Sequence, residues 1–236
     1  MGDKDKEYDA GAVEWHEGDM PYSPEFGDHF YSRADGRKEC GHVFIGGNGL
    51  PERWRNKSDF TVAELGFGTG LNFAETLRQW LADEQRSDRL TFVSFELHPL
   101  SAGEIDRALA VWPELDLQRK DLVQVWPPKP DGIVRIDLAE AVSLKVHIGK
   151  AFHCLPLWRE TADAWYLDGF APARNPEMWS QELMQAVFDH TGAGGTCATY
   201  SAAGWVRRNL QAAGFEVEKR PGYAGKRDMM AGRRGA

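Results

Sequence analysis

Three glycines and an acidic residue, closely spaced in the chain, form the first group that could bind a ligand. They lie in the segment Glu64-Leu65-Gly66-Phe67-Gly68-Thr69-Gly70. Glycines lack a Cβ atom and therefore let the backbone turn sharply and approach a ligand closely. The dinucleotide fingerprint is G-x-G-x-x-G, whereas the third glycine here comes one residue earlier. The spacing therefore argues against an NAD-dependent dehydrogenase, and Glu64 suits a ligand with a cationic amino acid part.

Two further carboxylates lie at the ends of apolar runs. Glu96 lies near the end of the run 90–97, where a carboxylate can accept hydrogen bonds from both hydroxyls of a ribose. Asp168 follows the run 164–167, where a carboxylate can orient an amine and take its proton, because only the neutral amine has the attacking lone pair. Both residues also have a structural interpretation, Glu96 as a surface carboxylate and Asp168 as a turn former.

The elements expected to position these residues alternate between strands and helices. Strands are predicted at 60–65, 90–97, 164–167, 196–200 and 215–219, and helices at 71–82, 101–111, 176–190 and 203–213. Segments 133–138 and 142–148 alternate apolar and polar residues and predict a β-hairpin around Ala139-Glu140. This order indicates an α/β fold with a mostly parallel sheet and helices on both faces. Ligands bind such sheets at the carboxyl ends of the strands.

The domain organisation is predicted to be simple. Residues 1–14 are interpreted as a flexible N-terminus, 15–232 as a single domain and 233–236 as a C-terminal stump. Within the domain, the stretch 15–31 is rich in proline, glycine, aspartate and aromatic residues, which predicts an ordered but irregular lead-in.

The composition favours a cytoplasmic globular protein. Hydrophobic residues make up 42% of the chain, and nine tryptophans and twelve phenylalanines supply a large core. No apolar run approaches the roughly 20 residues of a membrane helix, so we expect no membrane partner. Cys40, Cys154 and Cys197 are far apart and form no C-x-x-C motif, which argues for a reducing compartment and against a metal site.

The charge is unevenly distributed. The net charge of −8 speaks against a nucleic-acid partner. Residues 204–236, however, hold eight basic residues against three acidic ones, so this segment is net positive. From charge alone, a phosphate-binding surface and an ordinary solvated face are equally good interpretations.

Three segments resemble the methyltransferase half of the MnmC family of tRNA wobble-uridine modification enzymes. They are 62–73 (VAELGFGTGLNF), 165–179 (WYLDGFAPARNPEMW) and 203–225 (AGWVRRNLQAAGFEVEKRPGYAG), within a similarity that extends over residues 15–232. The resemblance implies a class I S-adenosylmethionine methyltransferase, a Rossmann-like α/β fold with an N-terminal extension and a β-hairpin insertion. It also implies N-methylation of the 5-aminomethyl group of (2-thio)uridine at the wobble position, with the anticodon region of tRNA as partner.

The resemblance carries roles over to individual residues. It implies that Asp168 sits at the methyl-transfer site and that Asn72 closes over the methionine part of the cofactor. The implied cofactor-binding residues are Glu64, Gly66, Phe67, Gly68, Thr69, Gly70, Asn72 and Glu96. The implied substrate-binding residues are Phe30, Tyr31, Phe170, Arg174, Lys226 and Arg227, with the first two walling a pocket for the flipped uridine. An RNA-facing strip then becomes the favoured interpretation of Arg207, Arg208, Lys219, Arg220, Lys226 and Arg227.

Two departures from the family pattern stand out. Gly149-Lys150 occupy the place where relatives carry an acidic residue that meets the adenine amine, which leaves backbone groups as the alternative. In the bifunctional enzymes an FAD-dependent oxidoreductase half follows, whereas this sequence ends at Ala236. The chain is therefore expected to be a stand-alone methyltransferase or a piece of a longer protein, and FAD is expected only in the second case.

Two other functions stay open. A small-molecule amine N-methyltransferase would share the fold and the donor, and would explain the acidic body of the chain. A non-catalytic RNA-binding relative would share the fold alone, although the presence of Glu64, Glu96 and Asp168 disfavours it. The sequence predicts no oligomeric state.

Overall fold

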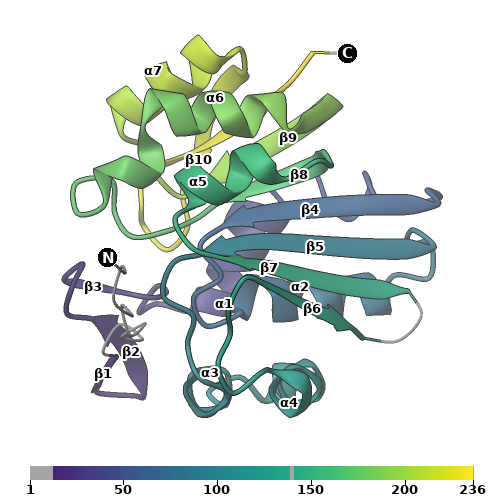
Figure 1. Ribbon diagram of the computed structural model, residues 1–236. Helices are drawn as coiled ribbons and strands as arrows, with labels where there is room; N and C mark the ends of the chain where they lie inside the picture. The colour runs from purple at the N-terminus through teal and green to yellow at the C-terminus, as the bar shows by residue number, and fades with distance from the viewer. Residues whose placement is uncertain (1–12, 139–140, 236) are drawn as a thin grey trace, which may run out of the picture.

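The computed structural model describes residues 13–138 and 141–235, in which an eight-stranded sheet forms the centre (Figure 1). Its strand order is β10-β11-β9-β8-β4-β5-β7-β6. The five inner strands from β9 to β7 run parallel, and β6, β10 and β11 are antiparallel additions at the two edges. The strands are β4 (Asp59–Leu65), β5 (Arg89–Glu96), β6 (Ile133–Asp137), β7 (Val142–Ile148), β8 (Ala162–Leu167), β9 (Thr191–Thr199), β10 (Glu216–Pro221) and β11 (Asp228–Arg233). The predicted mostly parallel sheet is confirmed.

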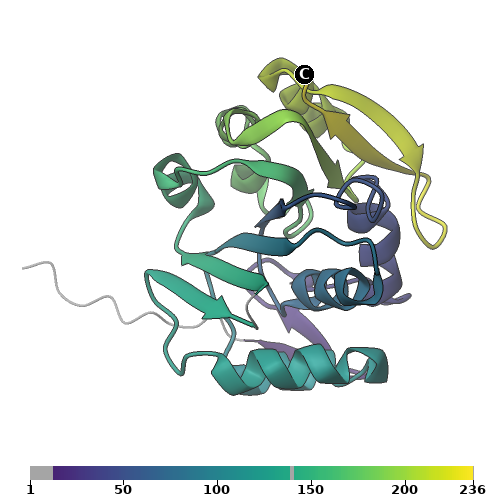
Figure 2. The ribbon, with the colours of Figure 1, turned by 90° about the vertical axis from the view of Figure 1, so that its right-hand side faces the viewer.

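Helices cover both faces of this sheet, as the view in Figure 2 shows. One face carries α1 (Gly36–Glu39), η1 (Cys40–Ile45), α2 (Leu71–Ala82), α3 (Ala102–Leu109), η2 (Pro113–Leu115) and α4 (Asp116–Val125). The other carries α5 (Ala151–Cys154), η3 (Leu155–Leu157), η4 (Pro176–Trp179), α6 (Gln181–Asp189) and α7 (Gly204–Ala213). Because both faces are covered, β4 is apolar on both sides: Phe60 and Val62 belong to one core cluster, Ala63 and Leu65 to the other.

The predicted strand, glycine turn and helix around residues 60–82 are confirmed. The turn needs glycine, because Gly66, Gly68 and Gly70 have φ values of 85°, 51° and 75°. Helix α2 begins directly after Gly70 and buries Phe73 and other apolar residues of one face against the sheet. The turn is therefore fixed at the carboxyl end of β4.

The other predicted elements agree in kind but differ in extent. Helix α3 begins with the expected capping box between Ser101 and Glu104. The hairpin of β6 and β7 forms, and β7 also joins β5 in parallel, so it belongs to the central sheet. The predicted helix 176–190 is wrong as one element, because Ser180 adopts an extended backbone and caps α6 by accepting a hydrogen bond from the Leu183 N–H.

Several short or weakly patterned elements escaped prediction, and three cases show the physical reason. The segment expected to be irregular contains a small antiparallel sheet of β1 (Glu14–His16), β2 (Met20–Ser23) and β3 (Asp28–His29), whose strands are too short to show alternation. Helix α4 buries only Gln118 and Leu122 and therefore lacks a clear apolar stripe. Strand β11 contains methionine, alanine and glycine where strand signals require β-branched or aromatic residues.

The predicted boundaries at the two ends of the domain differ from the structure. Glu14 belongs to β1, and residues 1–12 lie outside the described residues. At the other end β11 includes Arg233, and the Arg234 N–H donates to the Gly195 carbonyl at 2.9 Å. Residues 233 and 234 are thus part of the fold and no stump. Ala139 and Glu140 also lie outside the described residues, and no helix in the described part is long and apolar enough to cross a membrane.

Gly47, two residues after η1, lies directly against strand β9 of the sheet. A Cβ atom there would collide with the Val43 carbonyl oxygen and lie 2.7 Å from the Ala198 Cβ. We therefore expect Gly47→Ala to lower the free energy of unfolding by about 3 kcal/mol, measured by urea denaturation. Gly103→Ala is the matched control, because nothing lies within 4 Å of its added Cβ and α3 gains helix propensity. Equal stabilities of the two variants would contradict the close packing at Gly47.

Candidate active site

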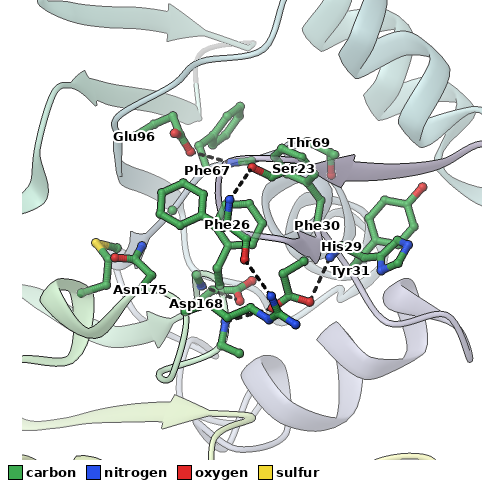
Figure 3. A pocket seen from close by; sticks show the side chains of 18 of the residues that line it. Ser23, Phe26, His29, Phe30, Tyr31, Phe67, Thr69, Glu96, Asp168 and Asn175 are labelled. Carbon is green, nitrogen blue, oxygen red and sulfur yellow. Dashed lines mark hydrogen bonds between the residues drawn. The ribbon is translucent and has the colours of Figure 1, made fainter. Parts of the chain in front are cut away.

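A cavity of about 1200 Å³ opens at the carboxyl ends of the central strands. Residues of the glycine turn, Glu96 and Asp168 line its inner side. Residues of the segment 23–33, from the end of β2 past β3, form its outer wall (Figure 3). Pockets for one small ligand usually span about 300–1,000 Å³, so this cavity is larger than one such ligand usually occupies. Its position is the one predicted from the strand ends.

Glu96 is held rigidly on one side of the cavity. Its Oε2 accepts a hydrogen bond from the Gly68 N–H at 2.8 Å, and its Oε1 accepts one from the His98 N–H at 2.7 Å. Each carboxylate oxygen keeps a second lone pair, so Glu96 can still accept two ribose hydroxyls. Glu96 thus lines the cavity with its orientation fixed by two backbone N–H groups.

The glycine turn leaves room beside Glu96. A Cβ atom at Gly66 would stand 3.6 Å from the Gly169 Cα, and one at Gly68 would stand 3.3 Å from Cδ1 of Phe30. Side chains at these two positions would therefore narrow the passage between the turn and the opposite wall. The turn and Glu96 therefore border open space at the carboxyl ends of β4 and β5.

Asp168 lies on another side of the cavity, at the end of β8 (Figure 3). Its Oδ1 accepts a hydrogen bond from the Gly169 N–H at 2.7 Å and its Oδ2 accepts one from Asn72 Nδ2 at 2.8 Å. Desolvation raises the pKa of Asp168 to about 7, although both hydrogen bonds act in the opposite direction. A carboxyl with this pKa can accept a proton near neutral pH.

Charged and polar groups from distant parts of the chain surround Asp168. Lys226, from the β10–β11 loop, donates to Glu39 Oε1 at 2.6 Å, and both residues line the cavity. Glu39 raises the pKa of Asp168, and Lys226 lowers it. The Tyr200 hydroxyl donates to the Gly169 carbonyl at 2.7 Å, which fixes the backbone next to Asp168.

Aromatic side chains form the wall that faces these carboxylates. Phe170 stacks on Phe26 with ring centroids 4.5 Å apart and meets Phe30 edge to face at 5.3 Å. Tyr31 packs against Trp112, and its hydroxyl donates its hydrogen to the Ala108 carbonyl at 3.2 Å, so it has no hydrogen left to donate to a ligand. Flat rings of this kind suit stacking against a nucleobase.

The outer wall is tied to the loop after Asp168 by two polar contacts. Asp28 Oδ2 accepts a hydrogen bond from the Ala171 N–H at 3.1 Å, and Arg174 donates to the Phe26 carbonyl at 3.4 Å. Arg174 is thus engaged at the rim of the cavity. These contacts link residues that are more than 140 positions apart in the chain.

The structure brings most of the predicted site residues together. The cavity is lined by Phe30, Tyr31, Gly66, Phe67, Gly68, Thr69, Asn72, Glu96, Asp168, Phe170, Arg174 and Lys226. Glu64, Gly70 and Arg227 do not line it. Glu64 is 0% exposed beneath the turn, Gly70 caps α2, and Arg227 lies on the exposed β10–β11 loop. The structure therefore does not place these three residues in contact with a ligand in this cavity, as the prediction would require for Glu64 and Gly70.

Other residues at the cavity were missed. Tyr200 follows β9 at the same edge of the sheet, so the rule that identified Glu96 would have found it. Phe26, Asp28 and Glu39 carry no such signal, because tertiary folding alone brings the N-terminal extension to the sheet.

The predicted basic strip is partly neutralised. Lys219 pairs with Asp228, Arg220 with Glu218, and Lys226 with Glu39. Arg208 and Arg227 are exposed and have no ion-pair partner among the residues that the structure describes. At the predicted adenine position, Lys150 lines the cavity and donates to Glu177 at 3.4 Å, next to Ala151 and Phe152.

The sequence of this chain is similar to those of known proteins over most of its length. Residues 113–235 match a family described as S-adenosyl-L-methionine-dependent methyltransferases. The bifunctional MnmC protein of tRNA 5-methylaminomethyl-2-thiouridine biosynthesis from Caulobacter vibrioides is 44% identical over 218 residues, which are 92% of this chain and 37% of the relative. The same protein from Methylobacillus flagellatus is 45% identical over 231 residues, 96% of this chain and 35% of the relative. The chain thus spans about a third of the length of these relatives, and the predicted resemblance is confirmed.

A solved structure agrees in fold. The crystal structure of MNMC2 from Aquifex aeolicus aligns with a TM-score of 0.76 at 22% identity, over 93% of this chain and 69% of that one. This likeness confirms the Rossmann-like arrangement of the sheet and its helices. Family, fold and a cavity at the carboxyl ends of the strands agree with one another. The chain belongs to the S-adenosyl-L-methionine-dependent methyltransferases.

Proposed function

We propose that this chain methylates the amine of 5-aminomethyl-(2-thio)uridine at the tRNA wobble position, giving the 5-methylaminomethyl nucleoside. The observation that carries the proposal is the position of Asp168, a carboxyl with a pKa of about 7 in a cavity walled by Phe30 and Phe170. An amine on an aromatic base would then meet a base and a stacking surface together. The similarity to MnmC proteins over more than nine-tenths of the chain supports the same substrate.

The chain's own residues would have two tasks in this reaction. When bound, S-adenosylmethionine supplies a methyl group on a sulfonium, which is already activated for transfer. Glu96 and the glycine turn would hold the donor's nucleoside, and Phe30 and Phe170 would hold the uridine, so that amine and methyl are aligned. Asp168 would orient the amine and accept the proton that it loses at Oδ1 or Oδ2.

This role for Asp168 predicts a pH dependence. The base must be deprotonated, and desolvation raises its pKa to about 7. Methyl transfer is therefore expected to fall tenfold per unit as the pH drops below about 7, measured as kcat/KM with tRNA. If the catalytic carboxyl had the ordinary pKa of an aspartate, about 3.9, the enzyme would keep full activity down to about pH 5. A profile that stays flat to this value would contradict the proposed protonation state.

A methyl-incorporation assay separates the proposal from its two rivals. Labelled S-adenosylmethionine is incubated with the protein and either tRNA that carries the aminomethyl group or small primary amines. Incorporation into tRNA alone is expected. Transfer to small amines at equal efficiency would favour a small-molecule enzyme, and donor binding without any transfer would favour a non-catalytic relative.

The surface charges predict how salt acts on tRNA binding. Arg208 and Arg227 form no ion pair with any residue that the structure describes, so each would release a bound counterion when it contacts a phosphate. Lys219, in contrast, is paired with Asp228. Affinity should fall with salt, and Arg208→Ala or Arg227→Ala should each reduce the slope of log K against log salt by about one. Lys219→Ala is the control, with a smaller change. A slope that neither arginine variant alters would place the RNA elsewhere.

A further inference from the structure

Glu64 has no access to a ligand, although its position before the first glycine suggests cofactor binding. The residue is 0% exposed and is absent from the cavity wall. Its Oε2 accepts a hydrogen bond from the Ser94 hydroxyl at 2.8 Å, and its Oε1 accepts one from Asn72 Nδ2 at 2.8 Å. Both carboxylate oxygens are therefore engaged inside the protein, on the side of the sheet that α2 covers.

Asn72 connects Glu64 to Asp168. Its Nδ2 donates to Glu64 Oε1 and to Asp168 Oδ2, each at 2.8 Å. An amide nitrogen has two hydrogens, so these two bonds use both of them. Because carboxyl oxygens flank the amide, the nitrogen must face them and the orientation of the side chain is determined.

The geometry points to Glu64 as a positioning residue for Asp168, acting through Asn72. Glu64 fixes the Asn72 amide, and the amide then holds the Asp168 carboxyl at the cavity. The inference rests on the proposed role of Asp168 for its catalytic meaning, while the positioning itself is independent of turnover. It replaces the cofactor contact expected for Glu64 with an indirect role.

The arrangement works in either protonation state of Glu64. Burial raises the pKa of Glu64 well above its usual value. A proton on Oε2 would be donated to the Ser94 oxygen, which leaves Oε1 as the acceptor for Asn72. The Asn72 amide is therefore held across the pH range in which Asp168 titrates.

The link also influences the proton affinity of Asp168. The Asn72 hydrogen bond stabilises the ionised carboxylate and so lowers its pKa against desolvation. The other ionisable groups around Asp168 are Glu39, Cys40, Tyr200 and Lys226, of which Glu39 raises its pKa and Lys226 lowers it. Loss of the amide bond should therefore move the titration of Asp168 upward, by about one unit for one hydrogen bond to a charged group.

The test follows the Asp168 carboxyl directly, by NMR titration of the full chain labelled with ¹³C-aspartate. The Asp168→Asn spectrum identifies its resonance. Glu64→Leu and Asn72→Leu are expected to raise the titration midpoint by about one unit. Glu64→Gln should leave it unchanged, because its carbonyl can accept from Asn72 while its amide donates to Ser94.

Calorimetry with S-adenosylmethionine provides the second readout. Glu64→Gln should bind the donor as the unchanged protein does, because Glu64 does not line the cavity. A midpoint that Asn72→Leu does not move would overturn the inference, and so would a tenfold weaker donor affinity in Glu64→Gln. If Glu64→Leu fails to fold, Glu64→Met, which is similar in length but cannot accept the Asn72 hydrogen bond as an oxygen does, is expected to give the same rise, and an unmoved midpoint in it would also overturn the inference. Neither readout needs tRNA or turnover, so failure here differs from failure of the proposed function.

Discussion

Asp168→Asn is expected to abolish most methyl transfer while the protein still binds S-adenosylmethionine. The amide cannot accept the proton of the amine, and general base catalysis typically contributes about 10²- to 10⁴-fold. The substitution keeps the shape of the side chain, and its carbonyl oxygen can still accept from Asn72, while its NH₂ group replaces the acceptor of the Gly169 N–H and that one hydrogen bond is lost. We therefore expect kcat to fall within that range, with an unchanged dissociation constant for the donor.

Single-turnover kinetics and calorimetry measure the two quantities separately. Asp121→Asn is the matched control, since Asp121 is exposed on α4, away from the cavity. Near-normal turnover of Asp168→Asn would remove Asp168 from the mechanism. A large loss of donor affinity would instead assign Asp168 to cofactor binding.

Glu96→Gln is expected to weaken S-adenosylmethionine binding on the order of 100-fold, because one hydrogen bond to a charged group contributes about 1.5–3 kcal/mol. The substitution looks conservative but is not. Both oxygens of Glu96 accept backbone N–H groups, from Gly68 and His98, so an NH₂ group on either side would face a donor. The variant must lose one of these bonds, and it offers a ribose one acceptor in place of two.

Calorimetric titration with S-adenosylmethionine measures this loss. Glu84→Gln serves as the control, because Glu84 is exposed and does not line the cavity. Equal affinities of Glu96→Gln and Glu84→Gln would show that the donor's ribose is held elsewhere. A loss confined to turnover, with unchanged affinity, would contradict the binding role as well.

The sequence predicts the inner half of the site better than the outer half. The glycine turn, Glu96 and Asp168 lie at strand ends, and the order of strands and helices already places such ends at one edge of a sheet. The wall built from Phe26 and Asp28 could not be predicted in this way, because no local pattern indicates which sheet edge an N-terminal extension will cover.

The sequence pattern also could not show which polar side chains are buried. Glu64 looks like a ligand-binding residue because it precedes the glycines, yet its side chain points beneath the turn to Asn72 and Ser94. Side chains alternate between the two faces of a strand, and only the packing of α2 decides which face holds a buried carboxyl. Strand β11 was missed for a related reason, since Gly232 lies where a Cβ atom would stand 2.7 Å from Cys197 Sγ, and this lack of space cannot be read from a local pattern.

The most direct test of the proposed reaction is to measure the mass of the product nucleoside. tRNA that carries 5-aminomethyl-2-thiouridine is incubated with the protein and S-adenosylmethionine, digested to nucleosides and examined by mass spectrometry. We predict that the wobble nucleoside gains the mass of one methylene and that every other nucleoside is unchanged. A wobble nucleoside of unaltered mass, while the protein binds the donor and the tRNA, would contradict the proposal.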